Sequence, residues 1–269
     1  MTEFLDFRDH TVFVAGGSSG INLGIAEGFA ARGARLAIIS RSQERVDEAV
    51  RRLQAHGGEA IGMAADVRNP DAVEQALGAV HDKWGAIDVL ISGAAGNFPA
   101  AALGMSPNGF RTVVDIDLNG TFNVLRLAHR YLKQPGGSVI NISAPQSYVP
   151  TKYQAHVCAA KAGVDMLTRV LAMEWGGDGI RVNSIVPGPI EGTEGIRRLV
   201  PTQDAMDRML KTVPLGRLGT KTDIANMALF LSSPLCSYVT GAVIPVDGGR
   251  SLGGGSDLSA AVAPREGDA

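Results

Sequence analysis

Short apolar segments alternate with longer amphipathic segments along most of this chain. The apolar segments are bounded by Gly, Asp or Pro and contain few polar positions, as expected of strands that are buried on both faces. They predict strands at 11–15, 35–40, 60–65, 88–92, 138–143, 180–186 and 242–246. This alternation indicates an α/β fold with a doubly wound parallel sheet of about seven strands and helices on both faces.

The amphipathic segments predict the helices between those strands. One of them follows Asn69 and Pro70, an N-cap residue and a first-turn proline. The helices are predicted at 21–31, 43–55, 71–84, 108–132 and 155–175. Because ligands of such sheets bind beyond the carboxyl ends of the strands, candidate site residues are expected in the segments that follow the strands.

Two regions depart from this alternation. Residues 187–220 begin with Gly and Pro and continue into a short amphipathic helix, which predicts a mobile flap over the site. Residues 251–269 are small and polar and predict a flexible C-terminal tail. Residues 1–250 are therefore expected to form a single domain.

Composition narrows the possible partners. The chain has 269 residues, of which 45% are hydrophobic and 19% charged, and this suffices for one sizeable core. Its net charge of −2 gives no global field that favours nucleic acid or an anionic membrane, so neither is an expected partner. No apolar run approaches the roughly 20 residues of a membrane span.

Cysteine usage and the chain ends bear on location. Cys158 and Cys236 have no short metal-ligand spacing, so no metal site is expected, and a reduced compartment fits them. The N-terminal MTEFLDFRDH lacks a secretory signal pattern, and the C-terminal EGDA carries no peroxisomal address. A cytoplasmic location is the expectation.

The segment after the first predicted strand, AGGSSGINLGIAEGF, has the glycine spacing of a phosphate-binding turn. Gly16 and Gly20 allow a tight turn and a close backbone approach to a pyrophosphate, which the free N–H groups of the next helix would bind. The usual third glycine is Asn22, and asparagine tolerates a positive φ. Alone, such a pattern also describes a plain turn. Its place after the first strand favours a Rossmann-type dinucleotide-binding domain.

The second predicted strand ends in Ser40-Arg41-Ser42. An acidic residue here would bind a ribose 2′-hydroxyl, whereas an arginine suits a 2′-phosphate, so we expect NADPH (NADP) as the cofactor. The alternative is a solvent-exposed arginine at a helix start. Asp66, after the third strand, is placed either to accept from the adenine amino group or to cap the next helix.

These features together resemble the short-chain dehydrogenase/reductase superfamily over nearly the whole chain. The resemblance rests on AGGSSGI (15–21), Asp66-Val67, SGAAGNF (92–98), NIS (141–143), Lys161, RVNSIVPGP (181–189) and YVTGAVIPVDGG (238–249). It implies a set of cofactor-binding residues: Gly16, Ser18, Ser19, Gly20, Ile21, Ser40, Arg41, Asp66, Val67, Ala94, Ala95, Gly96, Lys161, Pro187, Gly188 and Ile190.

The usual catalytic residues of that superfamily are not all present. Its serine falls at Ala144, its tyrosine at Val157 and its asparagine at Asp117, and of the familiar set Lys161 remains. Val157 and Lys161 are four positions apart and share a helix face. His156 lies five positions before the lysine, so it points roughly 140° away and is a poor substitute for the tyrosine.

Within the superfamily the chain resembles the peroxisomal-type 2,4-dienoyl-CoA reductases. That likeness rests on SGAAGNF, VVDIDLNGTFNV (113–124), HVCAAKAGVDMLTRVLAMEWG (156–176) and VPGPIEGTEGIRRL (186–199). This branch also lacks the tyrosine and carries an aspartate at the position of Asp117. The likeness implies NADPH-dependent reduction of a conjugated acyl-CoA, with Asp117 and Lys161 as catalytic residues.

The same likeness implies a substrate-binding set. Residues matching Arg68 and Arg198 face the CoA in that branch, and Phe98 and the stretch near Ser106 line the acyl path. In the mitochondrial-type branch a loop tyrosine occupies the position of Gln146, so that tyrosine has no equivalent here.

Three readings of the function remain open on the sequence. The first is the dienoyl-CoA reductase, in which the site polarises the thioester oxygen and a water protonates carbon. The second is a reductase of another activated alkene or carbonyl that uses Tyr148 or Tyr153 as its acid. The third is a non-catalytic NADP(H)-binding module. The superfamily resemblance also implies a homotetramer, with apolar faces of 108–132 and 155–175 compatible with either assembly or packing on the sheet. His156 has either a site role or a structural or rim role.

Overall fold

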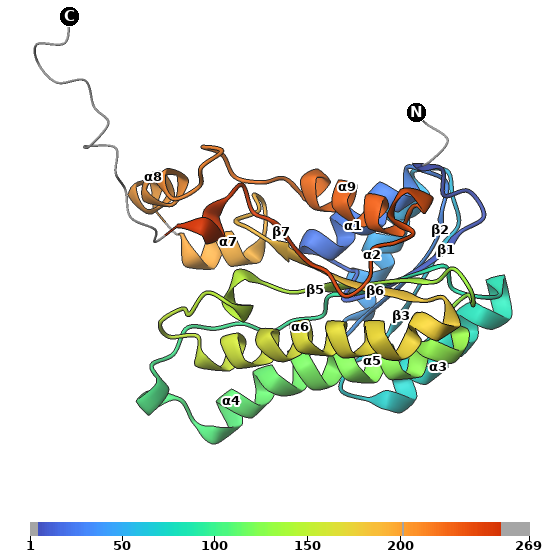
Figure 1. Ribbon diagram of the computed structural model, residues 1–269, viewed down its shortest axis with the longest axis horizontal. Coiled ribbons are helices and arrows are strands. Elements are labelled where there is room, and N and C mark those ends of the chain that lie inside the picture. The colour runs from blue at the N-terminus through green and yellow to red at the C-terminus, as the bar shows by residue number, and fades with distance from the viewer. Residues whose placement is uncertain (1–4, 201, 254–269) are drawn as a thin grey trace, which may run out of the picture.

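The computed structural model describes residues 5–200 and 202–253. Its seven strands form one parallel sheet in the order β3-β2-β1-β4-β5-β6-β7 (Figure 1). The strands are β1 (Thr11–Ala15), β2 (Arg35–Ser40), β3 (Ala60–Ala64), β4 (Val89–Ser92), β5 (Ser138–Ile142), β6 (Arg181–Pro187) and β7 (Val243–Val246). The strand order reverses between β1 and β4, which opens a crevice at their carboxyl ends. The predicted fold class is confirmed.

Helices cover both faces of the sheet (Figure 1). One apolar core lies beneath α1 (Gly20–Ala30), α2 (Gln43–Gln54) and α9 (Lys221–Ser232). The other lies beneath α3 (Pro70–Trp84), α5 (Gly120–Ala128) and α6 (Ala155–Trp175). The central strands are buried along their whole length, which explains why they appear in the sequence as continuous apolar runs.

The segment predicted as one helix over 108–132 is interrupted. It consists of α4 (Pro107–Val114), a π-helical turn at Asp115–Asn119, α5, and a 3₁₀ turn at His129–Tyr131. The π turn follows α4 directly, and Asp117 within it is 1% exposed. Turns of this type occur often at functional sites. Because the π turn spans only five residues, its different periodicity is too short-lived to appear in the sequence pattern.

The α9 helix was absent from the prediction, although its start has a recognisable signal. The Thr220 hydroxyl accepts from the Asp223 N–H, and the Asp223 carboxylate accepts from the Thr220 N–H. This reciprocal capping box appears in the sequence as Thr-x-x-Asp. The region predicted as a flap contains two short helices, α7 (Glu194–Leu199) and α8 (Gln203–Lys211), where one was expected.

Within the described part of the chain, no helix is both long and apolar enough to cross a bilayer. The same residues contain no cluster of His, Cys, Asp and Glu suited to a metal ion. Of the predicted tail, residues 254–269 lie outside the described residues.

Candidate functional site

Two adjoining cavities lie at the carboxyl edge of the sheet. The main cavity has a volume of about 740 Å³ and lies between the β1–α1 turn, the segments after β4 and β5, the start of α6 and the flap. The small cavity has a volume of about 220 Å³ and lies over the ends of β1, β2 and β3. All sixteen residues predicted to bind the cofactor line one cavity or the other: Gly16, Ser18, Ser19, Gly20, Ile21, Ser40, Arg41, Asp66, Val67, Ala94, Ala95, Gly96, Lys161, Pro187, Gly188 and Ile190.

The turn between β1 and α1 has the backbone that a phosphate cradle requires. Gly16 and Gly20 have φ of 80° and 61°, in the left-handed region that favours glycine. Asn22 lies inside α1 without a positive φ, so the turn does not use the tolerance of asparagine for that conformation. Its side-chain Nδ2 donates to Gly93 O at 2.8 Å and to Gly16 O at 3.3 Å. Asn22 therefore ties the turn to the end of β4.

The N-terminus of α1 is available to a phosphate. Its N-cap residue, Ser19, makes no side-chain capping hydrogen bond, and Ser18 and Ser19 both line the small cavity. The first-turn N–H groups and the dipole of this 11-residue helix favour an anion at this point. These groups fit a dinucleotide pyrophosphate.

Arginines mark the far end of the small cavity. Arg41 and Arg45 both line it beside Ser40, and within the described residues Arg41 makes neither a hydrogen bond nor an ion pair. The sequence reasoning missed Arg45, whose place four positions after Arg41 was the available signal. Two guanidinium groups here fit a 2′-phosphate.

Asp66 and Arg68 bind each other. The Arg68 guanidinium donates to both Asp66 carboxylate oxygens, at 2.6 Å for the closest pair, and this contact lowers the pKa of Asp66. Asn69 caps α3, so the alternative of Asp66 as that cap was wrong. Asp66 lines the small cavity, whereas Arg68 lines neither cavity.

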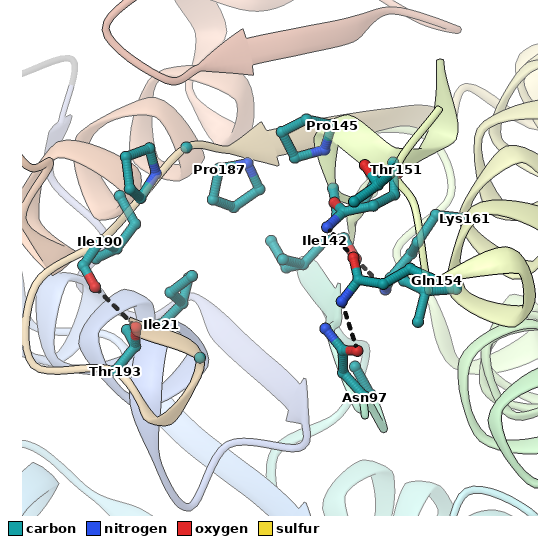
Figure 2. Close-up of a pocket in the computed structure, with 18 of the residues that line it drawn as sticks. Ile21, Asn97, Ile142, Pro145, Thr151, Gln154, Lys161, Pro187, Ile190 and Thr193 are labelled. Carbon is teal, nitrogen blue, oxygen red and sulfur yellow. Dashed lines mark hydrogen bonds between the residues drawn. The ribbon is translucent and has the colours of Figure 1, made fainter. Parts of the chain in front are cut away.

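The two predicted catalytic residues meet at the main cavity. The Asp117 carboxylate accepts the Gly96 N–H at 2.7 Å through Oδ1, and its Oδ2 lies 3.6 Å from Lys161 Nζ. Lys161 Nζ in turn donates to Ile142 O at 2.9 Å (Figure 2). Both side chains are nearly fully buried. The carboxylate and the ammonium are thus held side by side at the cavity wall.

Burial raises the pKa of Asp117 above its ordinary value of 3.8, although Lys161 and the Gly96 N–H act in the opposite direction. The sequence left open which of these effects prevails, and the structure favours desolvation. A carboxyl with a raised pKa retains its proton more readily and is suited to donate it.

This raised pKa predicts a pH-dependent stability difference. The neutral carboxyl is favoured in the fold, so its stabilising effect is complete at acid pH and is lost as pH rises past 3.8. Asp117→Asn does not titrate. We therefore expect the thermal midpoint of the variant, relative to wild type, to rise between about pH 4 and pH 7. Parallel melting curves would measure it, and a difference that does not change with pH contradicts the raised pKa.

The position of the usual tyrosine is apolar and buried. Val157 lines the main cavity with an exposed fraction of 3%, and Ala144 lines it as well. Tyr148 is 46% exposed and does not line the cavity. Tyr153 is 62% exposed, has a φ of 65° and lies at the cavity rim. These exposures do not favour a loop tyrosine as the acid.

Three side-chain amides form a hydrogen-bonded chain along the cavity wall, and the sequence analysis did not identify this chain. Gln146 Nε2 donates to Gln154 Oε1 at 2.7 Å, and Gln154 Nε2 donates to Asn97 Oδ1 at 3.0 Å. Figure 2 shows the Asn97 nitrogen on the side of its carboxamide that faces the open space of the cavity. All three residues line the main cavity. The segment SGAAGNF had been singled out, but its asparagine was not.

His156 lies in the interior. Its ring is fully buried and packs against Phe98, with the ring centroids 4.5 Å apart. This burial rules out a place at the rim and agrees with the structural alternative. Burial lowers the pKa of this histidine below 6.5, and neither ring nitrogen has a hydrogen bond of normal geometry within the described residues.

The predicted substrate residues have different surroundings. Phe98 is 37% exposed beside His156 and does not line the main cavity. The Ser106 hydroxyl caps α4 by accepting the Gly109 N–H at 3.0 Å. The side chain of Arg198 lies outside the described residues. The flap contributes Thr193, Ile196 and Met209 to the main cavity, and the last two make part of it apolar.

Comparison with known proteins gives consistent matches. Residues 15–251 match the family described as Enoyl-(Acyl carrier protein) reductase. The chain is 47% identical over 247 residues to a peroxisomal 2,4-dienoyl-CoA reductase [(3E)-enoyl-CoA-producing] of Pongo abelii, covering 91% of this chain and 85% of that protein. It is 39% identical to a probable 2,4-dienoyl-CoA reductase [(2E)-enoyl-CoA-producing] of Bacillus subtilis, covering 90% and 96%.

A solved structure of a short-chain dehydrogenase from Bacillus anthracis matches the fold with a TM-score of 0.83. It is 38% identical and covers 92% of this chain and 99% of that one.

Proposed function

Because the chain belongs to the Enoyl-(Acyl carrier protein) reductase family of short-chain dehydrogenases/reductases, we propose that it is an NADPH-dependent 2,4-dienoyl-CoA reductase. The observation that carries this proposal is the buried Asp117–Lys161 pair beside Val157. This site offers a proton and a cation, but at the usual position of the tyrosine it has Val157. Such a site suits a substrate whose negative charge is delocalised away from the carbon that accepts the hydride.

The cofactor proposal rests on the two cavities. Gly16, Ser18, Ser19 and Gly20 would hold the pyrophosphate, and Arg41 with Arg45 would hold the 2′-phosphate. Lys161 would hold the nicotinamide ribose in the main cavity. The bound NADPH supplies the hydride.

The residues of the chain would stabilise the negative charge that develops on the substrate and supply the proton. Hydride addition at C5 of the 2,4-dienoyl group moves negative charge through the conjugated system to the thioester oxygen. The free Nδ2 of Asn97 is a donor for that oxygen. Burial raises the pKa of Asp117, which favours its protonated form, and Asp117 would pass that proton to carbon through an ordered water. Overall, substrate, NADPH and one proton give the enoyl-CoA and NADP⁺.

The position of the new double bond depends on where that proton arrives. Protonation at C2 gives the (3E)-enoyl-CoA, and protonation at C4 gives the (2E)-enoyl-CoA. The higher identity to the (3E)-producing relative supports C2. Incubation with 2,4-hexadienoyl-CoA and NADPH, followed by NMR of the product, tests the proposal. A 3-enoyl product supports it, a 2-enoyl product contradicts the C2 assignment, and recovery of unreacted dienoyl-CoA contradicts the function.

The acyl-CoA phosphates need cations near the cavity mouth. Arg68 and Arg198 are proposed for this role, with Phe98 and the segment at Ser106 along the acyl path. Arg68 is held by Asp66, so it would offer its remaining donor positions to a phosphate.

We also propose a homotetramer, and a location in the cytoplasm. Large apolar side chains are exposed on the outer faces of α4, α5 and α6: Phe110, Phe122, Met166, Val170 and Met173. Exposed apolar side chains of this size favour burial against another copy. Light scattering gives the mass in solution, and a monomer would contradict the assembly.

A further inference from the structure

Along the chain of amides at the wall of the main cavity, Gln146 donates to Gln154 and Gln154 donates to Asn97. Gln154 is 3% exposed, and its carboxamide is satisfied at both ends: its oxygen accepts from Gln146 Nε2, and its nitrogen donates to Asn97 Oδ1. If the carboxamide of Gln154 rotated by half a turn, its Nε2 would face Gln146 Nε2, and two donors would then point at each other. In this arrangement Gln154 occupies Asn97 Oδ1, and Asn97 Nδ2, which has no hydrogen-bond partner among the described residues, faces the cavity (Figure 2).

The backbone reinforces this arrangement. Tyr153, the residue before Gln154, has a φ of 65°, in the left-handed region that costs energy for a non-glycine residue. Its carbonyl oxygen accepts the Ala100 N–H at 2.8 Å. The segment after β4 that carries Asn97 is therefore attached to the start of α6 at two points, one through the backbone and one through side chains.

A free asparagine at this position would present either face of its carboxamide. With the nitrogen inward it stabilises a negative oxygen, and with the oxygen inward it repels one. The hydrogen bond from Gln154 favours the first orientation, since it occupies Asn97 Oδ1.

We propose that Gln154 is a positioning residue that directs the Asn97 donor at the substrate thioester oxygen, with Gln146 fixing the orientation of Gln154. This inference rests on the proposed function. According to this inference, a chain of neutral amides orients the hydrogen-bond donor for the thioester oxygen. Val157 and Ala144 stand where the superfamily has its tyrosine and serine, and neither has a hydroxyl group.

The test is a double-mutant cycle with Gln154→Met and Asn97→Ala. Methionine has a similar length but no amide. We expect Gln154→Met to lower kcat with 2,4-hexadienoyl-CoA by about 10- to 100-fold without changing NADPH affinity. In the Asn97→Ala background, the same change should have no further effect, because the residue acts through Asn97. Equal losses in both backgrounds overturn the inference.

A spectroscopic readout separates this inference from turnover. In the complex with NADP⁺, which cannot give a hydride, a hydrogen bond to the thioester oxygen shifts the dienoyl absorption band to the red. We expect this shift in wild type and its loss in Gln154→Met. Gln54→Met, in α2, makes the same chemical change away from the cavity and should retain it.

Gln154→Glu is a second variant for the case in which the methionine variant does not fold. A carboxylate only accepts, so it would draw Asn97 Nδ2 away from the cavity, and the red shift should again be lost. Retention of the shift in these variants, or a wild type without any shift, overturns the inference. A wild type that shows the shift but does not oxidise NADPH contradicts the proposed function, while the shift still decides the role of Gln154.

Discussion

Replacing Asp117 with alanine lowers kcat for 2,4-hexadienoyl-CoA by about 10²- to 10⁴-fold, the range expected when a general acid is removed. The reason is the buried carboxyl at the cavity wall, whose pKa is raised by desolvation and which faces Lys161 Nζ at 3.6 Å. Lys161→Ala produces a loss of similar size. Initial rates of NADPH oxidation measure both, with NADPH affinity determined separately by fluorescence.

Asp115→Asn is the matched control for this prediction. Asp115 lies in the same π-helical turn, but it binds Asn119 Nδ2 on the outside at 2.8 Å. Its rate should stay close to that of wild type. If Asp117→Ala binds NADPH normally and retains wild-type turnover, Asp117 is not the proton source.

Replacing Arg41 with aspartate changes the preference for the cofactor. The guanidinium lines the small cavity and makes no hydrogen bond or ion pair within the described residues, so its loss removes a charge-assisted contact to a 2′-phosphate. We expect kcat/KM with NADPH to fall about 10- to 100-fold. An aspartate at this position also accepts from a ribose 2′-hydroxyl, so kcat/KM with NADH should rise.

The same charge change at Arg51, an exposed residue further along α2, controls for the general loss of positive charge. Arg51→Asp should leave the ratio of the two cofactors unchanged. An Arg41→Asp variant that still prefers NADPH as strongly as wild type contradicts the assignment of the small cavity.

The strands of the sheet could be predicted because each of them has a recognisable apolar sequence of its own. Strands such as β1 and β5 are buried on both faces, so burial alone makes their sequences apolar throughout. The π-helical turn could not be predicted in the same way, because it is only five residues long and is flanked by α-helical residues on both sides. The motif residues lie at the carboxyl edge since parallel strands bring their ends together.

The features of the site that could not be predicted from the sequence depend on contacts between residues far apart in the chain. Asn22 looked like a substitute for a turn glycine, yet its side chain reaches Gly93, 71 positions away. Asn97 and Gln154 are 57 positions apart and meet only after folding. A pattern along the chain cannot show that these amides form one ordered chain.

The central claim is that a site without the usual tyrosine reduces a conjugated thioester, and the oxidation of NADPH by the wild-type protein tests it most directly. With 2,4-hexadienoyl-CoA present, we expect NADPH absorbance to fall in step with loss of the dienoyl chromophore, while simple ketones give no reaction. A wild-type protein that binds NADPH, leaves the dienoyl-CoA unchanged and reduces ketones would contradict the account.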